Sequence, residues 1–212
     1  MANSAMLGPS HPPTLGVILA GGLARRMGGG DKGLIDVGGR AMLARTIARL
    51  AQQVSALILN ANGDPARFAP FDLRVVADGV PGHPGPLAGV LAALEDAATH
   101  PGIEWVVAAP CDAPFLPYDL VAGLHRARRS SGAVAVSGGQ RHPTAALWPV
   151  ARRDEVRRAL VDDDIRRVNT LIDRFGFAEA EWPAEPFDPF INVNDPEGIA
   201  SAERLLSRWP EA

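Results

Sequence analysis

The sequence contains one cysteine, Cys111, in 212 residues. With a single thiol the chain can form no internal disulfide, so its composition gives no sign of an oxidising compartment, and we expect a cytoplasmic location. Long apolar stretches are also missing. Gly, Pro or a charged residue interrupts each run before it reaches the roughly 20 residues that span a bilayer, so we expect no membrane association.

The chain also lacks a strong excess of charge. Its 21 basic and 24 acidic residues leave a net charge of −3, which gives no overall attraction to nucleic acid and favours small molecules or proteins as partners. Hydrophobic residues make up 47% of the chain, enough for one core. We expect one domain over residues 14–212. Residues 1–13, which have neither a basic start nor a continuous apolar stretch, are interpreted as a flexible leader.

Apolar runs of strand length alternate with stretches that have helical spacing, which predicts an α/β fold with a mainly parallel sheet and helices on both faces. In such sheets ligands bind beyond the carboxyl ends of the strands. Strands are expected at 15–20, 56–60, 74–77, 105–109 and 133–137, helices at 41–54, 87–98, 116–129, 152–161, 165–175 and 196–208, and a Pro-rich linking loop at 182–189.

A glycine-rich segment follows directly on the first expected strand and ends at Lys32. Glycines let successive backbone N–H groups turn toward phosphate oxygens, and Arg26 and Lys32 would neutralise charge there. Lys32 is the only lysine; the other 20 basic residues are arginines. A compact ammonium suits a crowded phosphate site, so this exception indicates function. The segment matches neither a P-loop, because Gly33 follows Lys32, nor a dinucleotide-binding fingerprint, because no acidic residue stands about 20 positions on.

The strand expected at 105–109 leads into Pro110-Cys111-Asp112-Ala113-Pro114. Asp112 therefore lies at the carboxyl end of a strand, where one carboxylate can hold Mg²⁺ when substrate phosphates and water supply the other oxygens. Closing a turn is the alternative role for this residue. Cys111 has no identifiable base, so we interpret it as a structural, buried cysteine.

Several further residues are candidates for ligand contact. Asn60 and Asp78 follow expected strands and are able to hydrogen-bond a base or ribose, although both residue types also form turns. Residues 85–89 open a helix with little side-chain bulk, where backbone groups could meet a flat base. His142-Pro143-Thr144 suggests a substrate pocket or simply a loop. Further candidates are Arg166 and Arg167, expected on a helix, and Asn192 and Asn194, which share one side of an extended segment.

These motifs together resemble the molybdenum cofactor guanylyltransferases. The pattern combines L-A-G-G at 19–22, R-M-G at 26–28, D-K-G at 31–33, Asn60, G-P-L-A-G at 85–89, P-C-D-x-P at 110–114, H-P-T at 142–144 and N-V-N at 192–194. Each piece is common by itself, but the ordered set is specific. The segment 79–83 is longer than in the family pattern.

The resemblance implies a single-domain, Rossmann-like nucleotidyltransferase fold and an enzyme that transfers GMP from GTP to Mo-molybdopterin with release of pyrophosphate. It implies molybdoenzyme apoproteins or their chaperones as partners, and Mg²⁺ held by Asp112. The residues it assigns to GTP are Leu19, Ala20, Gly21, Gly22, Lys32, Asn60, Asp78 and Asp112, with Arg26 at the phosphates, and those it assigns to the pterin are Arg166, Arg167, Asn192 and Asn194. Two alternatives stay open: a cytidylyltransferase acting on molybdopterin or another phosphorylated small molecule, and a non-catalytic protein that delivers finished cofactor.

Overall fold

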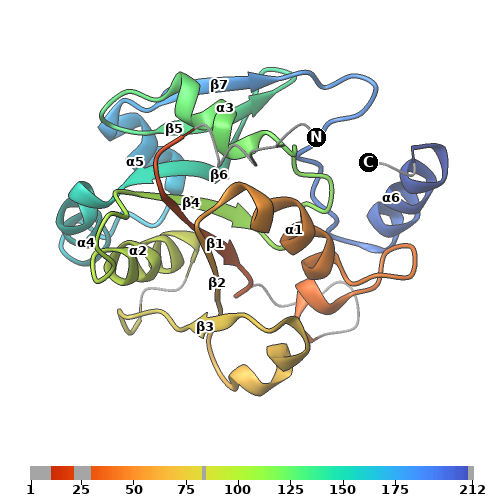
Figure 1. Cartoon of the computed structure of the whole chain (residues 1–212), viewed down its shortest axis with the longest axis horizontal. Coiled ribbons are helices and arrows are strands. Elements are labelled where there is room, and N and C mark those ends of the chain that lie inside the picture. The colour runs from red at the N-terminus through yellow and green to blue at the C-terminus, as the bar shows by residue number, and fades with distance from the viewer. Residues whose placement is uncertain (1–10, 22–29, 83–84, 210–212) are drawn as a thin grey trace, which may run out of the picture.

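A computed structural model of the chain describes residues 11–21, 30–82 and 85–209. Its centre is a sheet of seven strands in the order β3-β2-β1-β4-β6-β5-β7, which runs from the bottom to the top of Figure 1. The strands are β1 (Thr14–Leu19), β2 (Ala56–Asn60), β3 (Arg74–Val76), β4 (Trp105–Pro110), β5 (Ala133–Ser137), β6 (Gln140–Pro149) and β7 (Ala178–Trp182). Six of them run in one direction, and only β6 is antiparallel to its neighbours.

Six α-helices are described: α1 (Met42–Leu50), α2 (Pro86–Ala97), α3 (Leu120–Ala127), α4 (Arg153–Val161), α5 (Val168–Phe175) and α6 (Pro196–Arg208). The 3-10 turns are η2 (Lys32–Leu34), η3 (Ala51–Gln53), η4 (Pro65–Phe71) and η5 (Val150–Arg152). None of the helices in the described part of the chain is long and apolar enough to cross a bilayer.

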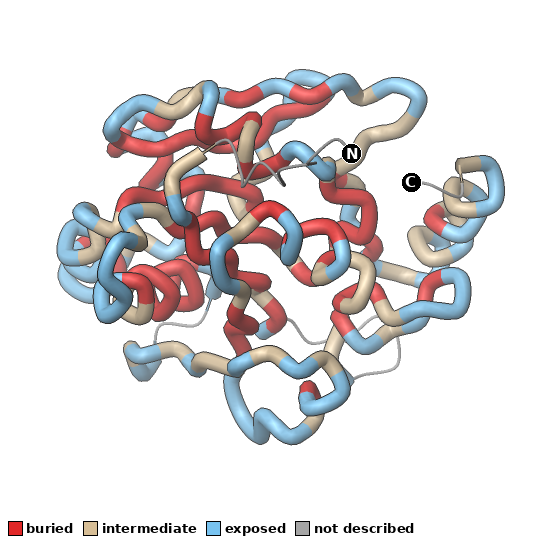
Figure 2. The backbone as a smooth tube through the Cα atoms, viewed as in Figure 1, coloured by how far each residue is buried: buried red, intermediate tan, exposed pale blue. Residues whose placement is uncertain are grey.

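The sheet separates two hydrophobic layers. Side chains of α2, α4 and α5 pack on one face, around Val17, Val106 and Trp148, while α1, α3 and η4 pack on the other, around Ile18, Val107 and Leu147. Because both faces are covered, the central strands read as continuous apolar runs, and they are the most buried part of the chain (Figure 2). A third, smaller cluster fixes α6 at the end of the molecule away from α2 and α4 (Figure 1).

The expected α/β architecture is confirmed, with corrections in the second half of the chain. Two strands, β6 and β7, were not predicted, and His142 to Thr144 lie inside β6 rather than in a loop. The loop expected from residue 182 begins only after Trp182, which is the last residue of β7. Helix α5 begins at Val168, so Arg166 and Arg167 precede it instead of lying on it.

The sequence pattern did not indicate β6, whose pairing with β5 is interrupted by a shift in register. Ala135 pairs with His142 but Val134 pairs with Ala146, so three residues of β6, Pro143 to Ala145, have no partner on β5. Proline has no N–H to donate to a sheet, and a bulge is the place where none is needed. These unpaired residues lie near the carboxyl end of β4, since they line one cavity together with Pro110, the last residue of that strand.

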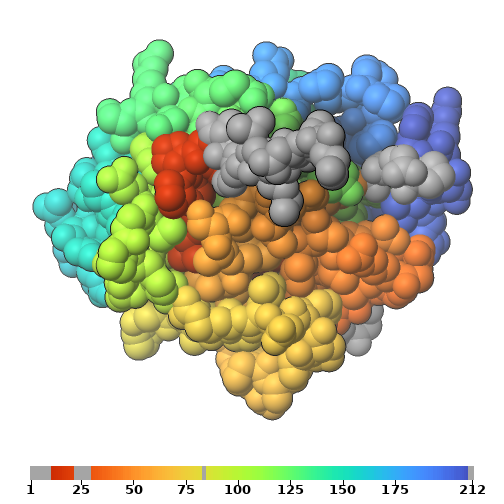
Figure 3. Space-filling view, in the orientation of Figure 1, coloured from red at the N-terminus to blue at the C-terminus, as the bar shows by residue number. Residues whose placement is uncertain are grey.

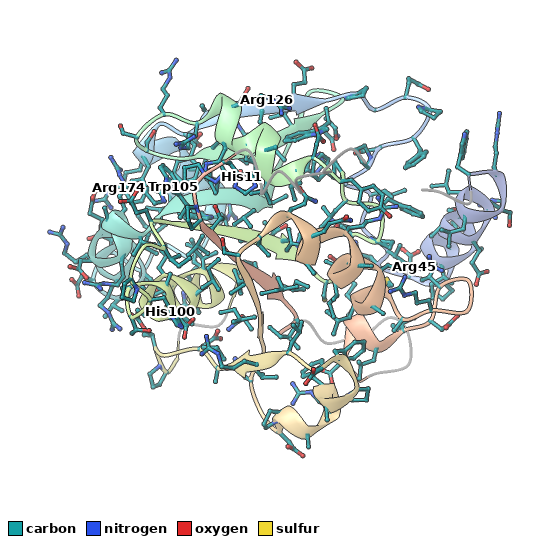
Figure 4. All side chains as sticks on the ribbon, in the orientation of Figure 1. His11, Arg45, His100, Trp105, Arg126 and Arg174 are labelled. Atoms are coloured by element: carbon teal, nitrogen blue, oxygen red, sulfur yellow. The ribbon has the colours of Figure 1, made fainter. Side chains whose placement is uncertain are left out.

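A buried histidine marks the opposite end of the sheet. Thr14 Oγ1 donates its only hydrogen to Pro12 O (2.8 Å), so at its 2.8 Å contact with His125 the ring Nε2–H must be the donor. His125 Nδ1 then carries no proton, and among the described residues it has no hydrogen-bond partner. The ring stacks on His11 and meets the edge of Trp105; these two neighbours are labelled close together in Figure 4.

This environment makes the stability of the fold depend on pH. Burial, with smaller effects from Arg128 and His11, lowers the pKa of His125 to about 4. The unfolded chain, with an ordinary pKa near 6.5, binds the proton more readily, so we expect stability to be constant above about pH 7 and to fall by roughly 1–2 kcal/mol by pH 5. Urea unfolding of the wild type and His125→Gln at pH 7.5 and 5 measures this, and an equal loss in both proteins would contradict the assignment to His125.

Candidate functional site

The carboxyl ends of β1 to β4 meet at one edge of the sheet. In the register, Leu19 stands between Asn60 and Pro110, and Asn60 stands beside Val76. The strand ends therefore bring sequence-distant residues around one cavity of about 350 Å³. It is lined by Leu19, Gly21, Lys32, Asn60, Asn62, Asp78, Gly85, Pro86, Pro110, Cys111, Asp112, Thr144 and Asn192.

Three polar side chains meet at one end of this cavity. Lys32 begins η2, Asp112 follows β4, and Asn194 precedes α6; the Lys32 ammonium contacts Asp112 Oδ2 and Asn194 Oδ1. The Lys32 and Asp112 side chains are only 14% and 15% exposed. Val193 N donates to Asp112 O (2.9 Å), which fixes the Asn192 to Asn194 segment against the end of β4. Lys32 and Asp112, both of which the resemblance assigns to GTP, are thus in contact, and Asn194 joins them.

Close packing beneath this group holds Lys32 in place. A Cβ atom at Gly33 would lie 3.3 Å from Cys111 Cβ and 3.3 Å from Leu43 Cβ, so any side chain there would push these neighbours aside by a few tenths of an ångström, whereas glycine permits the close approach of η2 to β4 and α1. Cys111 N donates to Leu19 O (3.2 Å), which continues the pairing of β1 with β4. Burial, followed by the Asp112 carboxylate, raises the pKa of the Cys111 thiol to about 12, so the thiol stays protonated and acts as packing.

Asn60 and Asp78 form a second polar group, at the other side of the cavity. Both amide hydrogens of Asn60 are used: Nδ2 donates to Val76 O (3.1 Å) and to Asp78 Oδ1 (2.9 Å). Asn60 is 5% exposed, and a Cβ at Gly89 would lie 2.1 Å from its Oδ1, so the opening of α2 is shaped around this amide. Asn60 therefore positions Asp78 through its donors, a role that its place at a strand end does not reveal.

Asn62 completes the arrangement and was not predicted. Its Nδ2 donates to Asp78 Oδ2 (2.7 Å), and its Oδ1 accepts from Asp78 N (2.9 Å). The Asp78 carboxylate is held through both oxygens and has its orientation fixed before any ligand binds. The spacing of Asn60 and Asn62, two residues apart as strand β2 ends, was the available signal.

Arg67 connects the two polar groups. Its Nε lies 2.7 Å from Asp31 Oδ2, beside Lys32, and its Nη2 donates to Asn62 O (2.5 Å). The segment from residue 31 to α1 (orange) lies against η4 and its flanking loop (yellow) in the space-filling view (Figure 3). Arg67 had no role in the sequence interpretation, because nothing local to it indicates a long-range ion pair.

The other predicted residues fall into three groups. Ala20 is buried and its N–H donates to Asn60 O (2.9 Å), while Gly21 is exposed and lines the cavity. Gly22 and Arg26 lie outside the described residues. Arg166 and Arg167 are exposed and line neither this cavity nor the one beside it; Arg166 Nε donates to Asp164 Oδ1 (2.7 Å).

A second cavity of about 520 Å³ adjoins the first, and both share Pro110, Thr144 and Asn192. Residues His142 to Ala145 of β6, which include the bulge, line it together with Asp188 and with Phe190 to Asn192. The predicted pocket residues His142, Pro143 and Thr144 therefore line the same cavity as Asn192. Thr144 and Asn192 stand at the junction of the two cavities.

The acidic residues near the junction do not form a preassembled metal centre. Within the residues that the structure describes, no group of three or more His, Cys, Asp or Glu side chains is placed to hold a metal ion. Asp112 Oδ2 contacts Lys32, while Asp112 Oδ1 has no hydrogen-bond partner in the described ranges. One carboxylate with a free oxygen fits a hard cation whose other ligands come from a substrate.

The comparisons with known proteins identify the class. The model of the MobA-like NTP transferase domain matches residues 16–174. The solved structure of molybdopterin-guanine dinucleotide biosynthesis protein A from Archaeoglobus fulgidus has a TM-score of 0.69 at 20% identity, covering 92% of this chain and 99% of its own. That of 2-C-methyl-D-erythritol 4-phosphate cytidylyltransferase from Thermus thermophilus has a TM-score of 0.63 at 20% identity, covering 93% and 99%. The fold is that of a nucleotidyltransferase.

Closer relatives define the family. A molybdenum cofactor guanylyltransferase from Rhodopseudomonas palustris is 57% identical over 93% of this chain and 96% of its own length. A second, from Nitrobacter hamburgensis, is 59% identical over 92% and 96%. The chain belongs to the molybdenum cofactor guanylyltransferase family, which confirms the family expected from the ordered motifs.

Proposed function

We propose that the chain transfers GMP from GTP to the phosphate of Mo-molybdopterin, forming the guanine dinucleotide cofactor and releasing pyrophosphate. The observation that carries the proposal is the convergence of Lys32, Asp112 and Asn194 at one end of a cavity whose other side presents Asp78. This separates a charge-neutralising end, suited to a triphosphate, from an acceptor-rich side, suited to a nucleoside. The names of the close relatives supply the nucleotide and the pterin.

The nucleoside end depends on Asp78. A carboxylate accepts hydrogen bonds and donates none, so it suits ribose hydroxyls or the N–H groups of guanine. Each Asp78 oxygen already accepts one amide hydrogen, from Asn60 or Asn62, and keeps a further lone pair for a ligand. The amides fix the carboxylate before binding, which lowers the ordering cost when the nucleotide arrives.

The phosphate end would hold Mg²⁺ through Asp112. The family uses nucleoside triphosphates, and a single carboxylate with phosphate oxygens and water is a usual Mg²⁺ ligand set. When bound, the ion would neutralise charge on the phosphates and on the departing pyrophosphate. Lys32 supplies a second, compact positive charge, and the Asn194 carbonyl and the Asp112 carboxylate hold its ammonium at this end.

The chemistry requires alignment more than proton transfer. An oxygen of the acceptor phosphate attacks the α-phosphorus of GTP, the bond to the β-phosphate breaks, and pyrophosphate leaves with the electron pair. The attacking phosphate is already an anion near neutral pH, so no general base has to remove a proton. The task of the protein is to place two phosphates together and to offset their mutual repulsion.

Two alternatives remain testable. A cytidylyltransferase would share the same fold and phosphate end. A delivery protein would bind the finished cofactor but would not need the Lys32 and Asp112 pair beside a triphosphate cavity. We place the reaction in the cytoplasm, which the single cysteine supports, and infer molybdoenzyme apoproteins or their chaperones as recipients of the product.

Pyrophosphate release tests the proposed function. With Mo-molybdopterin and Mg²⁺ present, we expect release with GTP and little with CTP or ATP, because the relatives are guanylyltransferases. A preference for CTP would assign the chain to a cytidylyl reaction. No release with any nucleotide, combined with tight binding of the finished dinucleotide, would favour delivery.

The contacts of Lys32 predict that arginine cannot replace it. The Lys32→Arg substitution keeps the charge, but the larger planar guanidinium must fit between Asp112 and Asn194, in a space where the lysine side chain is 14% exposed. We expect turnover to fall by on the order of 10² to 10³-fold, as for loss of one aimed stabilising contact, with a similar fall for Lys32→Met. Steady-state kinetics measures this beside a thermal melt, and wild-type turnover in the Arg variant would show that Lys32 supplies only generic charge.

A further inference from the structure

The second cavity contains a hydrogen-bonded network that the nucleotide site does not use. Ser137 Oγ donates to Asp188 Oδ1 (2.7 Å), and Phe190 N donates to the same oxygen (2.9 Å). Because the hydroxyl has a single hydrogen, the 2.6 Å contact between Ser137 Oγ and His142 Nε2 must have the histidine as donor. Ser137 is 1% exposed, so the network is anchored in the core.

This network fixes what the cavity wall offers a ligand. With its proton on Nε2, His142 carries a lone pair on Nδ1. Burial lowers the pKa of His142, although Asp188 acts in the opposite direction, and the lowered pKa favours the neutral ring. In the described ranges neither His142 Nδ1 nor Asp188 Oδ2 has a hydrogen-bond partner. The ring is held by stacking on Phe190, with centroids 4.5 Å apart and an interplanar angle of 17°. His142 and Asp188, which both line the cavity, thus keep acceptor atoms and no unused donor.

The positive charge of Arg141, near His142 and Asp188 in this cavity, is already neutralised. Arg141 lines the cavity but pairs with Asp173 and with Glu179, both on the outer surface. A phosphate would therefore meet the negative Asp188 here without a free positive charge. At the other end, past Pro110, Thr144 and Asn192, stand Lys32 and Asp112. A ligand that has both N–H groups and a phosphate can satisfy the two ends in only one orientation.

We propose that the second cavity binds the acceptor substrate: His142 and Asp188, held in place by Ser137, recognise the N–H edge of a planar heterocycle whose phosphate arm extends to the Lys32 end. This rests on the proposed function, since it assigns the second substrate of that reaction. An aminopyrimidinone ring, the N–H-bearing end of a pterin, presents adjacent ring and amino N–H groups, which would pair with the two unused acceptors, Asp188 Oδ2 and His142 Nδ1. The cavity volume of about 520 Å³ lies in the range of small-molecule sites.

The substitution Asp188→Asn tests this with little change of shape. Asn keeps an oxygen for Ser137 and Phe190 but replaces the unused oxygen with an N–H donor, which would oppose the N–H edge of the ligand. We expect KM for Mo-molybdopterin to rise about 10-fold to 100-fold, the loss typical of a hydrogen bond to a charged group, with KM for GTP within twofold of wild type. His142→Phe, which keeps the stacking and removes the acceptor, should act in the same direction.

The matched control is Asp154→Asn, the same chemical change on an exposed ion-pair partner of Arg153 in α4, which lines neither cavity. We expect both KM values to stay at the wild-type level in this variant. An unchanged acceptor KM in Asp188→Asn, or a parallel rise in both KM values, would overturn the inference while leaving the proposed function intact.

A binding measurement without nucleotide tests this assignment of the cavity independently of the proposed reaction. Pterin fluorescence quenching with molybdopterin, without nucleotide, should show binding to the wild type and to Asp154→Asn, and weaker binding to Asp188→Asn. If no nucleotide is turned over but this pattern holds, the proposed function fails and the assignment of the cavity survives. If wild type and Asp188→Asn bind molybdopterin equally, or neither binds it, the inference is wrong.

Discussion

The contact of the Lys32 ammonium with Asp112 and Asn194 is the constraint on which the functional end of the molecule depends. Lys32 lies in η2, Asp112 follows β4 and Asn194 precedes α6. The contact therefore links Lys32 to residues that follow it by 80 and by 162 positions in the sequence. Partly buried charges are costly unless each has a partner, so these three segments must arrive together. The sheet register, the close approach at Gly33 and the hydrogen bond from Val193 to Asp112 are the features that bring them there.

Charge is divided between the two cavities in a way that follows from this contact. Among the residues lining them, Lys32 is a cation held at the shared end, whereas Arg141 is neutralised by outward-facing carboxylates. The far side of each cavity presents a carboxylate fixed by neutral groups, Asp78 by two amides and Asp188 by a hydroxyl and a backbone N–H. Two ligands with phosphates would therefore enter with those phosphates facing each other, which is the arrangement that a transfer between them requires.

The sequence predicted the parts of this arrangement that local patterns determine. Buried strands followed by glycine, Asn or Asp gave β1 to β4 and the positions of Lys32 and Asp112, because parallel strand ends share one edge of a sheet. It missed β6, where Pro143 lies in a bulge that depends on the pairing of Val134 and Ala135. It could not place Asn62, since its contacts with Asp78 cross 16 residues, nor show that Asn60 faces inward. The proposed pterin roles of Arg166 and Arg167 gain no geometric support, because both lie outside the two cavities.

The most direct test of the account is the Mg²⁺ dependence of nucleotide binding in Asp112→Asn. Calorimetry with a non-hydrolysable GTP analogue, with and without Mg²⁺, measures it, and circular dichroism checks the fold. The account predicts that Mg²⁺ strengthens binding to the wild type, and that the variant folds normally but loses most of this gain, because the amide keeps the shape while losing the charge that holds a hard cation. A folded variant that keeps the full Mg²⁺-dependent affinity would show that Asp112 only closes a turn and would contradict the central role of its contact with Lys32.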